Sequence, residues 1–408
     1  MIKNLNPNIL HLSYSATQGG AARAALRIHN GLLKFDKNST FLCVNSDIDS
    51  ERVVKISRNS FDFYKYKIRN KLGNIYTNLH HTNNPILHSA NFLYSNLHKK
   101  INITDFDLVN LHWINHEMIS IGDISKITKP IVWTLHDMWA FCGAEHVSYD
   151  SKYVNGYIQN HKLFNLDYRV WRKKKLLWQK PFNIVAPSQW MATCAKSSEI
   201  MKDWPITVIP NMININFWAP IDQKISREIL GLPQDIKIII FGGANGGLEY
   251  HKGGDLLIKI LNDLKGSDKE IYTINIGSTK FINNNLIDKY IGSVNNDIIL
   301  KLLYSASDLL LIPSRVDNFP NMALEAMSCG LPLIAFNIGG LKDICDHKLN
   351  GYLARPFEVD DFLLGIKETL YSNNYHNMKI LARKKIVENF SEEIIEIKYS
   401  NLYKKILK

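Results

Sequence analysis

Two carboxylates, Asp317 and Glu325, stand eight residues apart in the stretch IPSRVDNFPNMALEAMSCGLPLIAF. The preceding apolar segment ends at Ser314, Pro320 is typical of a helix start, and Gly330 is typical of a helix end. Asp317 is therefore predicted on the loop after a strand, and Glu325 inside a short helix. Because buried acids are rare unless they bind something, and Glu325 has apolar neighbours, the two acids form a candidate ligand site.

A glycine-rich loop follows a strongly apolar predicted strand in the stretch DIKIIIFGGANGGLEYHKGGDLLIKIL. The loop contains Gly243, and Lys252 comes just before the next predicted helix. Glycines let the backbone approach a ligand closely, and the amide groups of a helix start favour an anion. With the lysine, the loop is predicted to be a phosphate cradle. Its spacing matches neither a P-loop nor a nicotinamide-binding Rossmann loop.

A second small-residue loop, SATQGGAARAALRIHNGL, joins the first predicted strand to a helix. Gly19 and Gly20 lie at the end of this loop, and Arg23 falls in the first turn of the helix. The helix dipole disfavours a cation in that turn, and a bound anion facing Arg23 would offset the cost. This loop is therefore also predicted to approach an anionic group.

Histidines follow two other predicted strands. His136 comes directly after the strand in KPIVWTLHDMWAFCGAEH, and His112 ends the strand in DLVNLHW. Open α/β sheets bind ligands at the carboxyl ends of their strands. Both histidines are therefore predicted on the rim of a site, with Trp139 in an aromatic loop suited to stacking on a sugar ring. The alternative is that His136 and Asp137 form a structural pair.

Apolar runs alternate with helical periodicity along the whole chain, which predicts parallel sheets with helices on both faces. One set of strands ends near position 205, and a second set begins with ITVIP at position 206. The predicted fold class is α/β, with two Rossmann-like, doubly wound parallel-sheet domains at 1–205 and 206–386. The amphipathic segment 387–408 is predicted to be a helix that crosses back to the first domain.

The formal net charge of +11 belongs to the N-terminal half of the chain. Residues 1–205 hold 26 Lys and Arg against 15 Asp and Glu, whereas residues 206–408 hold 23 of each. A basic half beside a neutral half favours an anionic partner that meets the N-terminal domain. The alternative is a solvated basic surface without a partner.

The densest basic segment is 161–180, in which seven of twenty residues are Lys or Arg. Its basic run consists of Arg172, Lys173, Lys174 and Lys175, and Trp171 and Trp178 flank the run. Basic and aromatic residues on one helix are typical of a helix that lies on a membrane surface. The alternative is a solvated helix with two packed tryptophans.

The five cysteines are scattered and share no CxxC spacing. This argues against a disulfide framework or a zinc site, and it fits a reducing cytoplasm. No apolar run approaches the roughly 18 to 20 residues that a membrane span needs, and the N-terminus lacks the pattern of a signal peptide. The predicted location is the cytoplasm.

These stretches, in this order and at these separations, resemble family 4 glycosyltransferases. That family has the GT-B architecture, in which two Rossmann-like domains face a central cleft. The segment PSRVDNFPNMALEAMSCGLPLIAF is similar to the signature of the family. The segment WTLHDMWAFCG and the DNFPN variant resemble the subgroup that builds bacterial capsule, exopolysaccharide or O-antigen. The resemblance covers nearly the whole chain.

The resemblance implies a role for each matched residue. Glu325 would hold the ribose hydroxyls of the donor nucleotide, Asp317 would lie at the donor sugar, and Lys252 would bind the donor diphosphate. Asp317 is one methylene shorter than the Glu that is usual at its position. The Arg that normally precedes this lysine is missing, so Arg315 or His251 would have to compensate.

Other matched positions complete the expected site. Gly19 and Gly20 would approach the diphosphate and the acceptor, and His136 would lie near the transferred sugar. The donor-binding set also includes Gly243 and Asn318. The candidates for the acceptor side or for membrane contact are Arg23, His112, Trp139, Arg172, Lys173, Lys174 and Lys175.

The predicted activity is a retaining, metal-independent transfer of a hexosyl group from a UDP- or GDP-linked sugar to a glycan acceptor. The acceptor is expected to be linked to polyprenyl diphosphate, at the inner face of the cell membrane, in surface polysaccharide synthesis. Beyond the donor substrate no cofactor is predicted, and no nucleic-acid partner. Two alternatives stay open: a nucleotide-sugar 2-epimerase of the same fold, and a catalytically inactive nucleotide-sugar-binding protein.

Overall fold

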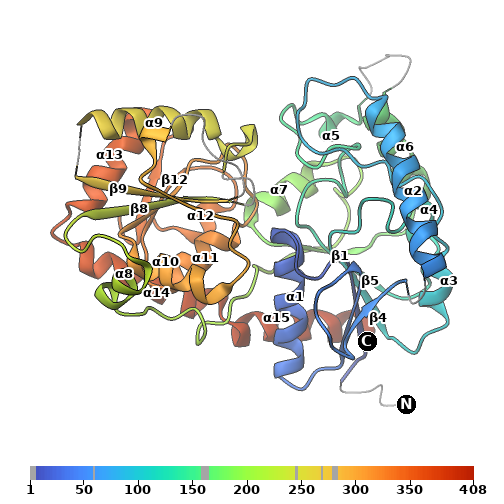
Figure 1. The fold of residues 1–408 in the computed structure, drawn as a ribbon. Helices are drawn as coiled ribbons and strands as arrows, with labels where there is room; N and C mark the ends of the chain where they lie inside the picture. The colour runs from blue at the N-terminus through green and yellow to red at the C-terminus, as the bar shows by residue number, and fades with distance from the viewer. Residues whose placement is uncertain (1–5, 58–59, 158–164, 244–246, 268–269, 278–283) are drawn as a thin grey trace. The chain divides into compact units, whose positions relative to one another are not determined.

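The computed structural model describes residues 6–408 apart from 58–59, 158–164, 244–246, 268–269 and 278–283. The chain forms two compact units, each built around a parallel sheet (Figure 1). The first unit contains Met1–Asn211 and Ile395–Lys408, and the second contains Met212–Ile394.

The first unit has a parallel sheet whose seven described strands lie in the order β3-β2-β1-β4-β5-β6-β7. These strands are β1 (Ile9–Ser15), β2 (Ser39–Asn45), β3 (Val53–Lys55), β4 (Leu108–Leu111), β5 (Ile131–Thr134), β6 (Asn183–Ala186) and β7 (Ile206–Val208). The strand order reverses between β1 and β4, which pair in parallel. Such a reversal is where doubly wound sheets place their ligands, beyond the carboxyl ends of the strands.

Helices connect these strands. They are α1 (Gly20–Lys34), α2 (Ser60–Asn78), α3 (Leu97–Asn102), α4 (Ile121–Ile124), α5 (Lys152–Asn155), α6 (Leu166–Leu177) and α7 (Gln189–Ser197). Along the described residues, no helix is both long and apolar enough to cross a bilayer.

The second unit has a parallel sheet of six described strands in the order β10-β9-β8-β11-β12-β13. The strands are β8 (Lys237–Gly242), β9 (Ile271–Ile276), β10 (Lys289–Gly292), β11 (Leu309–Ile312), β12 (Leu333–Phe336) and β13 (Gly351–Ala354). Here the strand order reverses between β8 and β11. The loops after these two strands are those that carry Lys252 and Asp317.

The helical elements of this unit begin with α8 (Gln223–Leu230), η1 (Tyr250–Lys252), α9 (Gly254–Ser267) and η2 (Asn284–Leu286). They continue with α10 (Asp297–Ala306), α11 (Asn321–Ser328), α12 (Leu341–Ile344), α13 (Val359–Leu370) and α14 (Tyr375–Phe390). The last helix of the chain is α15 (Glu392–Leu407).

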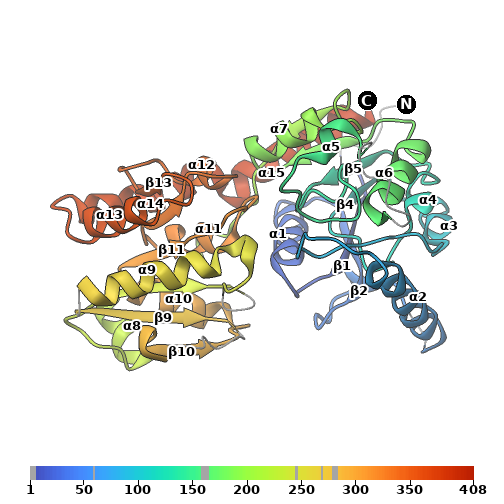
Figure 2. The same cartoon turned by 90° about the horizontal axis from the view of Figure 1, so that it is seen from above.

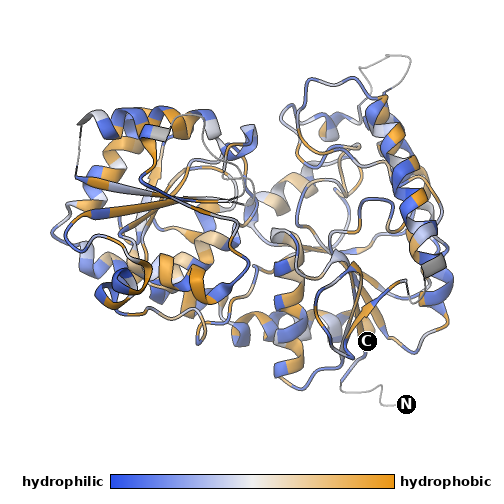
Figure 3. Cartoon of the chain, viewed as in Figure 1, coloured by the Kyte–Doolittle hydropathy of each residue, from blue (hydrophilic) through white to orange (hydrophobic). Residues whose placement is uncertain are grey.

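The central strand β8 is buried on both faces, which explains its continuous apolar run. Ile238 and Ile240 pack in one core cluster with residues of α10, α11 and α14, whereas Ile239 and Phe241 pack in another with residues of α9 and α13. Figure 1 shows α9 on one side of this sheet and α10 and α11 on the other, and Figure 2 shows α9 crossing the face of the sheet. Figure 3 shows the apolar residues concentrated along the strands. The apolar pattern alone therefore accounts for the layered architecture.

The C-terminal helix α15 packs on the first unit. Tyr399 and Tyr403 are buried, and the Tyr403 hydroxyl accepts a hydrogen bond of 2.8 Å from the Asn110 side chain in β4. The Tyr399 hydroxyl lies 3.3 Å from the Thr134 hydroxyl in β5. Two aromatic side chains with satisfied hydroxyl groups thus anchor the end of the chain against the sheet.

The structure differs from the sequence-based expectations in its details. The segment ITVIP, assigned to the second set of strands, forms β7 and pairs in parallel with β6 of the first sheet. The first unit accordingly runs to Asn211, beyond the predicted position 205. The short strands β3 and β10 lacked a clear apolar run. The predicted terminal helix is interrupted at Ser391, where α14 has ended and α15 begins.

Replacing Tyr403 tests the anchoring of α15. Tyr403→Ala is expected to lower the free energy of unfolding of the first unit by about 3–5 kcal/mol, because it removes a fully buried aromatic side chain. Ile397→Ala on the same helix is the matched control, since Ile397 is 51% exposed, and should change stability by less than about 0.5 kcal/mol. Urea denaturation measures both, and equal effects would contradict the packing of α15.

Candidate active site

In the second unit, the loops after β8 and β11 are joined through their backbones. The amide groups of Arg315 and Val316 donate hydrogen bonds of 2.8 Å and 3.2 Å to the carbonyl oxygen of His251. Gly253 has φ of +74°, and a Cβ there would lie 1.9 Å from the Pro313 carbonyl oxygen. Only glycine allows this approach, so the two loops form one surface at the carboxyl ends of their strands.

Lys252 and Asp317 meet on this surface. The Lys252 ammonium lies 2.7 Å from Asp317 Oδ2, and the Ser314 hydroxyl donates to the same oxygen at 3.2 Å. The Asp317 side chain is 10% exposed, and the Lys252 side chain is 36% exposed. The structure therefore brings together the residue expected at a diphosphate and the residue expected at a donor sugar.

The two residues expected to replace the missing arginine are differently placed. Arg315 makes a bidentate ion pair with Asp255, with distances of 2.5 Å and 2.8 Å, and this contact holds the pKa of Asp255 below its usual range. Burial, and then the charge of Lys252, lower the pKa of His251, so its imidazole is neutral at pH 7. Arg315 is thus neutralised by Asp255 and His251 is uncharged, so neither side chain adds an uncompensated positive charge next to Lys252.

Glu325 is buried in α11 and is 3% exposed. It accepts a hydrogen bond of 3.2 Å from the Tyr304 hydroxyl. Asn318 follows Asp317 on the same loop and is partly exposed. Gly243 has room for a Cβ, but its amide already donates to the Ile276 carbonyl oxygen at 3.0 Å, so that amide is engaged within the fold.

In the first unit, the loop from β1 to α1 is exposed at Gly19 and Gly20. Gly19 has φ of +90°, and a Cβ built on it would meet no atom within 4 Å. Its carbonyl oxygen accepts the Arg23 amide at 3.1 Å, and α1 has no acidic residue in its first turn. The predicted features of an anion-approaching loop are therefore placed together at the carboxyl end of β1, next to the reversal in strand order.

A chain of histidines leads from this region into the interior of the first unit. His136 Nε2 lies 3.0 Å from His112 Nδ1, and His112 Nε2 lies 2.9 Å from His11 Nδ1. His112 is 2% exposed and His11 is fully buried. The prediction that His112 lies on the rim of a site was wrong, because its ring is enclosed between those of His11 and His136.

These histidines are neutral at physiological pH. Burial lowers the pKa of His136 to about 4 and lowers the pKa values of His112 and His11 well below the usual range. A neutral imidazole donates through one nitrogen and accepts through the other. Because each contact between two of these rings needs one donor and one acceptor nitrogen, the tautomer of His136 sets those of His112 and His11.

The loop after β5 is closed by contacts that Asp137 makes with His146 and Trp113. Asp137 Oδ2 lies 2.5 Å from His146 Nδ1 and accepts the Trp113 indole N–H at 2.8 Å. Burial favours a raised pKa for Asp137, but the charge and hydrogen bond of His146 lower it overall. Asp137 is thus an ionised structural group that fixes the ends of the loop.

Trp139 and Lys174 are both buried, so they differ from the predictions that placed them at a sugar or a membrane. The Trp139 indole donates to the Ser89 carbonyl oxygen at 2.9 Å. The Lys174 ammonium donates to the carbonyl oxygens of Trp139, Cys142 and Gly143, and burial lowers the pKa of Lys174 to about 7. The loop turns inward, and Lys174 supplies donors that its carbonyl groups need.

The other basic residues of α6 stay near the surface. Arg172 and Lys175 are exposed, and Lys175 pairs with Glu199 at 2.9 Å. Lys173 is half-buried over the Phe92 ring. Trp171 and Trp178 are buried, which agrees with the alternative of a solvated helix with packed tryptophans. Residues 161–164 of the predicted basic segment lie outside the described residues.

Sequence reasoning missed several residues of these clusters. His11 lies within a buried strand, and Ser314 and Asp255 each contact a predicted site residue. The one signal for His11 was a histidine inside an otherwise apolar run. Nothing in the local sequence indicated that Asp255 pairs with Arg315, because the two residues are 60 positions apart.

The pH dependence of stability tests the neutral histidines. The pKa of His136 is about 4 in the folded protein and near 6.5 in the unfolded chain. Between pH 7 and pH 5 only the unfolded chain takes up this proton, so the free energy of unfolding of the protein falls by about 2 kcal/mol. His136→Gln should therefore flatten the fall in unfolding free energy over this range. The control His81→Gln removes an exposed histidine. Equal slopes for the two variants in urea denaturation would refute a buried, neutral His136.

Two family models match the chain, one described as Glycosyltransferase Family 4 over residues 18–217 and one as Glycosyl transferases group 1 over residues 222–385. An uncharacterised glycosyltransferase of Methanocaldococcus jannaschii is 29% identical over 194 residues, which cover 45% of this chain and 49% of that protein. An uncharacterised 41.2 kDa protein in the cps region of Klebsiella pneumoniae is 27% identical over 255 residues, which cover 59% and 68%. The chain thus spans about half the length of the archaeal relative.

Solved structures share the fold over almost the full chain. A sucrose-phosphate synthase from Thermosynechococcus elongatus has a TM-score of 0.67 at 15% identity and covers 98% of this chain and 99% of its own. Anabaena HepE in complex with UDP and glucose has a TM-score of 0.65 at 16% identity and covers 98% and 100%. At these identities the likeness shows the fold, which is the predicted GT-B architecture of two parallel-sheet α/β domains. With both family models matched in chain order, the protein belongs to glycosyltransferase family 4.

Proposed function

We propose that the protein transfers a hexosyl group, with retention of anomeric configuration, from a nucleotide-diphosphate sugar to a glycan acceptor. The observation that carries the proposal is the meeting of Lys252, Asp317 and Ser314 at the reversal in strand order of the second sheet. Family membership supports the reaction class, and the glycan acceptor and the retaining outcome are inferred from the family signature.

The charge of the leaving group sets the chemical requirement. Departure of a nucleoside diphosphate needs cations or N–H groups already placed where the charge develops. Lys252 is fixed for this task by the 3₁₀ turn η1, of which it is the last residue, and by its ion pair with Asp317. Arg315 is paired with Asp255, and His251 is neutral. We therefore infer that, within the described part of the second unit, Lys252 supplies most of the positive charge that faces the leaving group.

The contact between Lys252 and Asp317 suggests an exchange of partners. In the structure, Asp317 neutralises Lys252 at 2.7 Å. When a diphosphate takes Lys252, the Asp317 carboxylate becomes available to hydroxyl groups of the donor sugar. Glu325 lies in α11 behind this loop, where we expect it to accept hydrogen bonds from the ribose. Its partner Tyr304 supports the orientation of the carboxylate.

The first unit is proposed to bind the acceptor. His136 is partly exposed, and at neutral pH its imidazole is uncharged. Such a ring suits a hydrogen bond with a sugar hydroxyl and does not suit proton donation as an imidazolium. The Gly19–Gly20 loop would approach the phosphate or the acceptor. We also propose that the donor is linked to UDP or GDP, that the product belongs to a surface polysaccharide, and that the protein acts in the cytoplasm.

Relatives and neighbours support these finer points. The Klebsiella pneumoniae relative is a protein in the cps region, and WaaG, with a TM-score of 0.61 at 15% identity, is described as a glycosyltransferase involved in lipopolysaccharide biosynthesis. HepE was solved with UDP-glucose. We infer from them a UDP-sugar as the first donor to test.

Substitutions in the two units separate donor binding from transfer. Glu325→Gln is expected to abolish the thermal stabilisation by UDP, GDP or their sugars, because binding raises apparent stability by mass action. Asp317→Asn and His136→Ala should keep nucleotide binding and lower transfer by at least about 100-fold. The matched control is Asp263→Asn, an exposed acid on α9. Wild-type turnover in both Asp317→Asn and His136→Ala would refute the assigned roles.

Product identity separates the alternatives. A transferase releases a nucleoside diphosphate and a glycoside, and proton NMR of the glycoside shows whether the anomeric configuration is retained. A nucleotide-sugar 2-epimerase would convert the donor without an acceptor. Donor-dependent stabilisation without any product, across a panel of glycan acceptors, would favour the binding protein.

Membrane contact is proposed for α2 in preference to α6. Five apolar side chains of α2 and the residue after it are between 46% and 62% exposed; they are Tyr64, Ile68, Leu72, Ile75 and Leu79. At about 100° per residue they fall within an arc of about 80°. The lysines Lys65, Lys67 and Lys71 flank this arc and are exposed. An apolar stripe bordered by cations is typical of a helix on an anionic lipid surface.

Liposome flotation tests this surface. The variant Ile68→Ser, Leu72→Ser, Ile75→Ser should bind vesicles of phosphatidylglycerol and phosphatidylcholine at least about tenfold more weakly than wild type, since it removes exposed apolar area. The control Arg172→Gln, Lys175→Gln changes only exposed residues of α6 and should weaken binding less. Wild-type protein without preference for the anionic vesicles would overturn the membrane proposal and leave the donor site untouched.

A further inference from the structure

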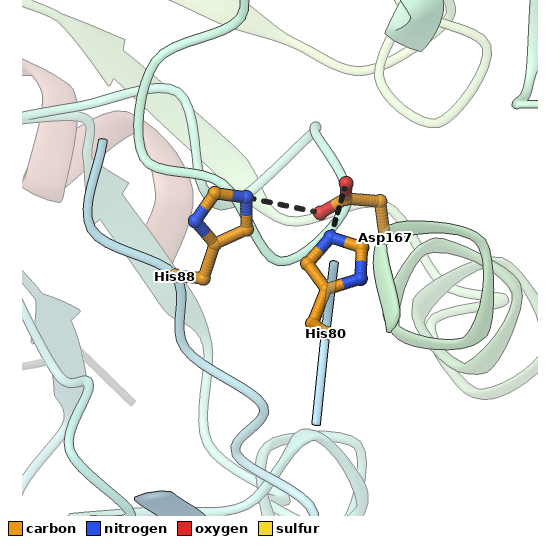
Figure 4. Close-up of side chains that lie close together, drawn as sticks. All are labelled: His80, His88 and Asp167. Atoms are coloured by element: carbon orange, nitrogen blue, oxygen red, sulfur yellow. Dashed lines mark hydrogen bonds and ion pairs between the residues drawn. The ribbon is translucent and has the colours of Figure 1, made fainter. Parts of the chain in front are cut away.

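Three side chains from separate segments of the first unit converge next to the loop after β5 (Figure 4). His80 follows the end of α2, His88 lies in the extended segment after it, and Asp167 lies in the first turn of α6. One ligand atom from each residue lies within 4.8 Å of the others. Their side chains are 6%, 7% and 17% exposed, respectively.

His88 has a nitrogen that the protein does not satisfy. Its Nδ1 donates a hydrogen bond of 2.6 Å to the Ile86 carbonyl oxygen, which fixes the ring. Its Nε2 is buried and has no hydrogen-bond partner among the described residues. The neighbouring Asp167 Oδ1 lies 3.7 Å away, too far for a hydrogen bond. A nitrogen lone pair and a carboxylate oxygen therefore face one another, which leaves a place for a cation.

Asp167 presents both of its oxygens to this cluster. Oδ1 accepts the Ala144 amide at 3.0 Å, and Oδ2 lies 3.0 Å from His80 Nε2. Hydrogen bonds alone can account for the position of His80. The Leu166 amide donates to His80 Nδ1 at 3.4 Å, and His80 Nε2 would then donate to Asp167. That explanation leaves His88 Nε2 without a partner.

A second carboxyl group lies next to Asp167. Glu145 accepts a hydrogen bond from the Tyr157 hydroxyl and is 3% exposed. Gly143 keeps the loop close to α6 at this place, because a Cβ there would lie 2.6 Å from the Asp167 Cα and 2.7 Å from Glu145 Oε2. Two imidazoles and two carboxyl groups are thus enclosed in one region, of which His80, His88 and Asp167 bring their ligand atoms within 4.8 Å of one another.

We propose that His80, His88 and Asp167 bind a divalent transition-metal ion, of which Zn²⁺ fits best, with a water as the fourth ligand. Imidazole and carboxylate are ligands that Zn²⁺ accepts, and its Zn–N bonds of about 2.0–2.1 Å set tetrahedral ligands about 3.3 Å apart. His80 Nε2 lies 3.0 Å from Asp167 Oδ2 and His88 Nε2 lies 3.7 Å from Asp167 Oδ1, so each imidazole is near this distance from one carboxylate oxygen. The hydrogen bond from His88 Nδ1 to the Ile86 carbonyl oxygen and the one from the Ala144 amide to Asp167 supply the outer contacts that hold such ligands.

The role of this ion is structural. It joins the segment after α2, the start of α6 and, through Ala144 and Glu145, the loop that begins at His136. Coordination through His80 Nε2 requires the tautomer of His80 that carries its proton on Nδ1, so the weak contact with the Leu166 amide is given up. The hydrogen bond between His80 and Asp167 is then replaced by two coordination bonds. The scattered cysteines gave no indication of this site, since its ligands are two histidines and an acid separated by up to 87 residues.

Metal analysis of the full-length protein tests the site. The purified protein is expected to contain close to one Zn²⁺ per chain by plasma mass spectrometry. After removal of the metal with dipicolinate, added Co²⁺ should give the visible absorption of a tetrahedral complex. His88→Ala and Asp167→Asn should weaken Co²⁺ and Zn²⁺ affinity by more than the roughly 10- to 100-fold that loss of an outer-shell partner produces.

The matched control is His81→Ala, because His81 adjoins His80 in sequence and is exposed. It should keep wild-type metal content and the Co²⁺ spectrum. Far-UV circular dichroism verifies that each variant is folded, and His88→Gln serves if His88→Ala does not fold. Folded wild-type protein that binds neither Zn²⁺ nor Co²⁺, or a folded His88→Ala that binds as wild type does, would overturn the proposal. Neither result depends on the donor site.

Discussion

The close approach of two loops at Gly253 and Pro313 is the constraint on which the candidate donor site depends. A side chain at 253 would overlap the carbonyl oxygen of Pro313, so the loops after β8 and β11 could not meet if the residue were not glycine. Once they meet, the His251 carbonyl binds the backbone of the facing loop, and Lys252 lies beside Asp317. The chemistry of the site is therefore a consequence of backbone packing at the reversal in strand order.

In the first unit, the main constraint is the burial of the long loop after β5. Buried carbonyl groups need donors, and here a lysine of α6, Lys174, provides them for three residues of the loop. Asp137 and His146 close the loop at its ends. This arrangement places polar groups in the interior of the unit. They include the neutral histidines His112 and His11, which form a chain of contacts with His136. Such groups hold one geometry firmly because any displacement leaves them unsatisfied.

Much of the fold, and the positions of Lys252 and Asp317 on loops after strands, could be predicted from the sequence. Apolar strands, glycine loops and the helix signals around Asp317 and Glu325 are local patterns, and the structure has the predicted parallel sheets. The fate of Trp139 could not be predicted, because an aromatic residue in a loop is equally compatible with a sugar contact and with a core position. Its burial depends on the distant segment that contains Ser89.

The sequence by itself determined the α/β class, the family and the residues that flank the strand ends, since these follow from periodicity and from short motifs. Only the tertiary structure decided which sheet β7 joins, that Arg315 is matched by Asp255, and that His80, His88 and Asp167 converge. The physical reason is that strand pairing, ion pairing and metal ligation join groups that are far apart along the chain. Their energies depend on distances that local sequence does not encode.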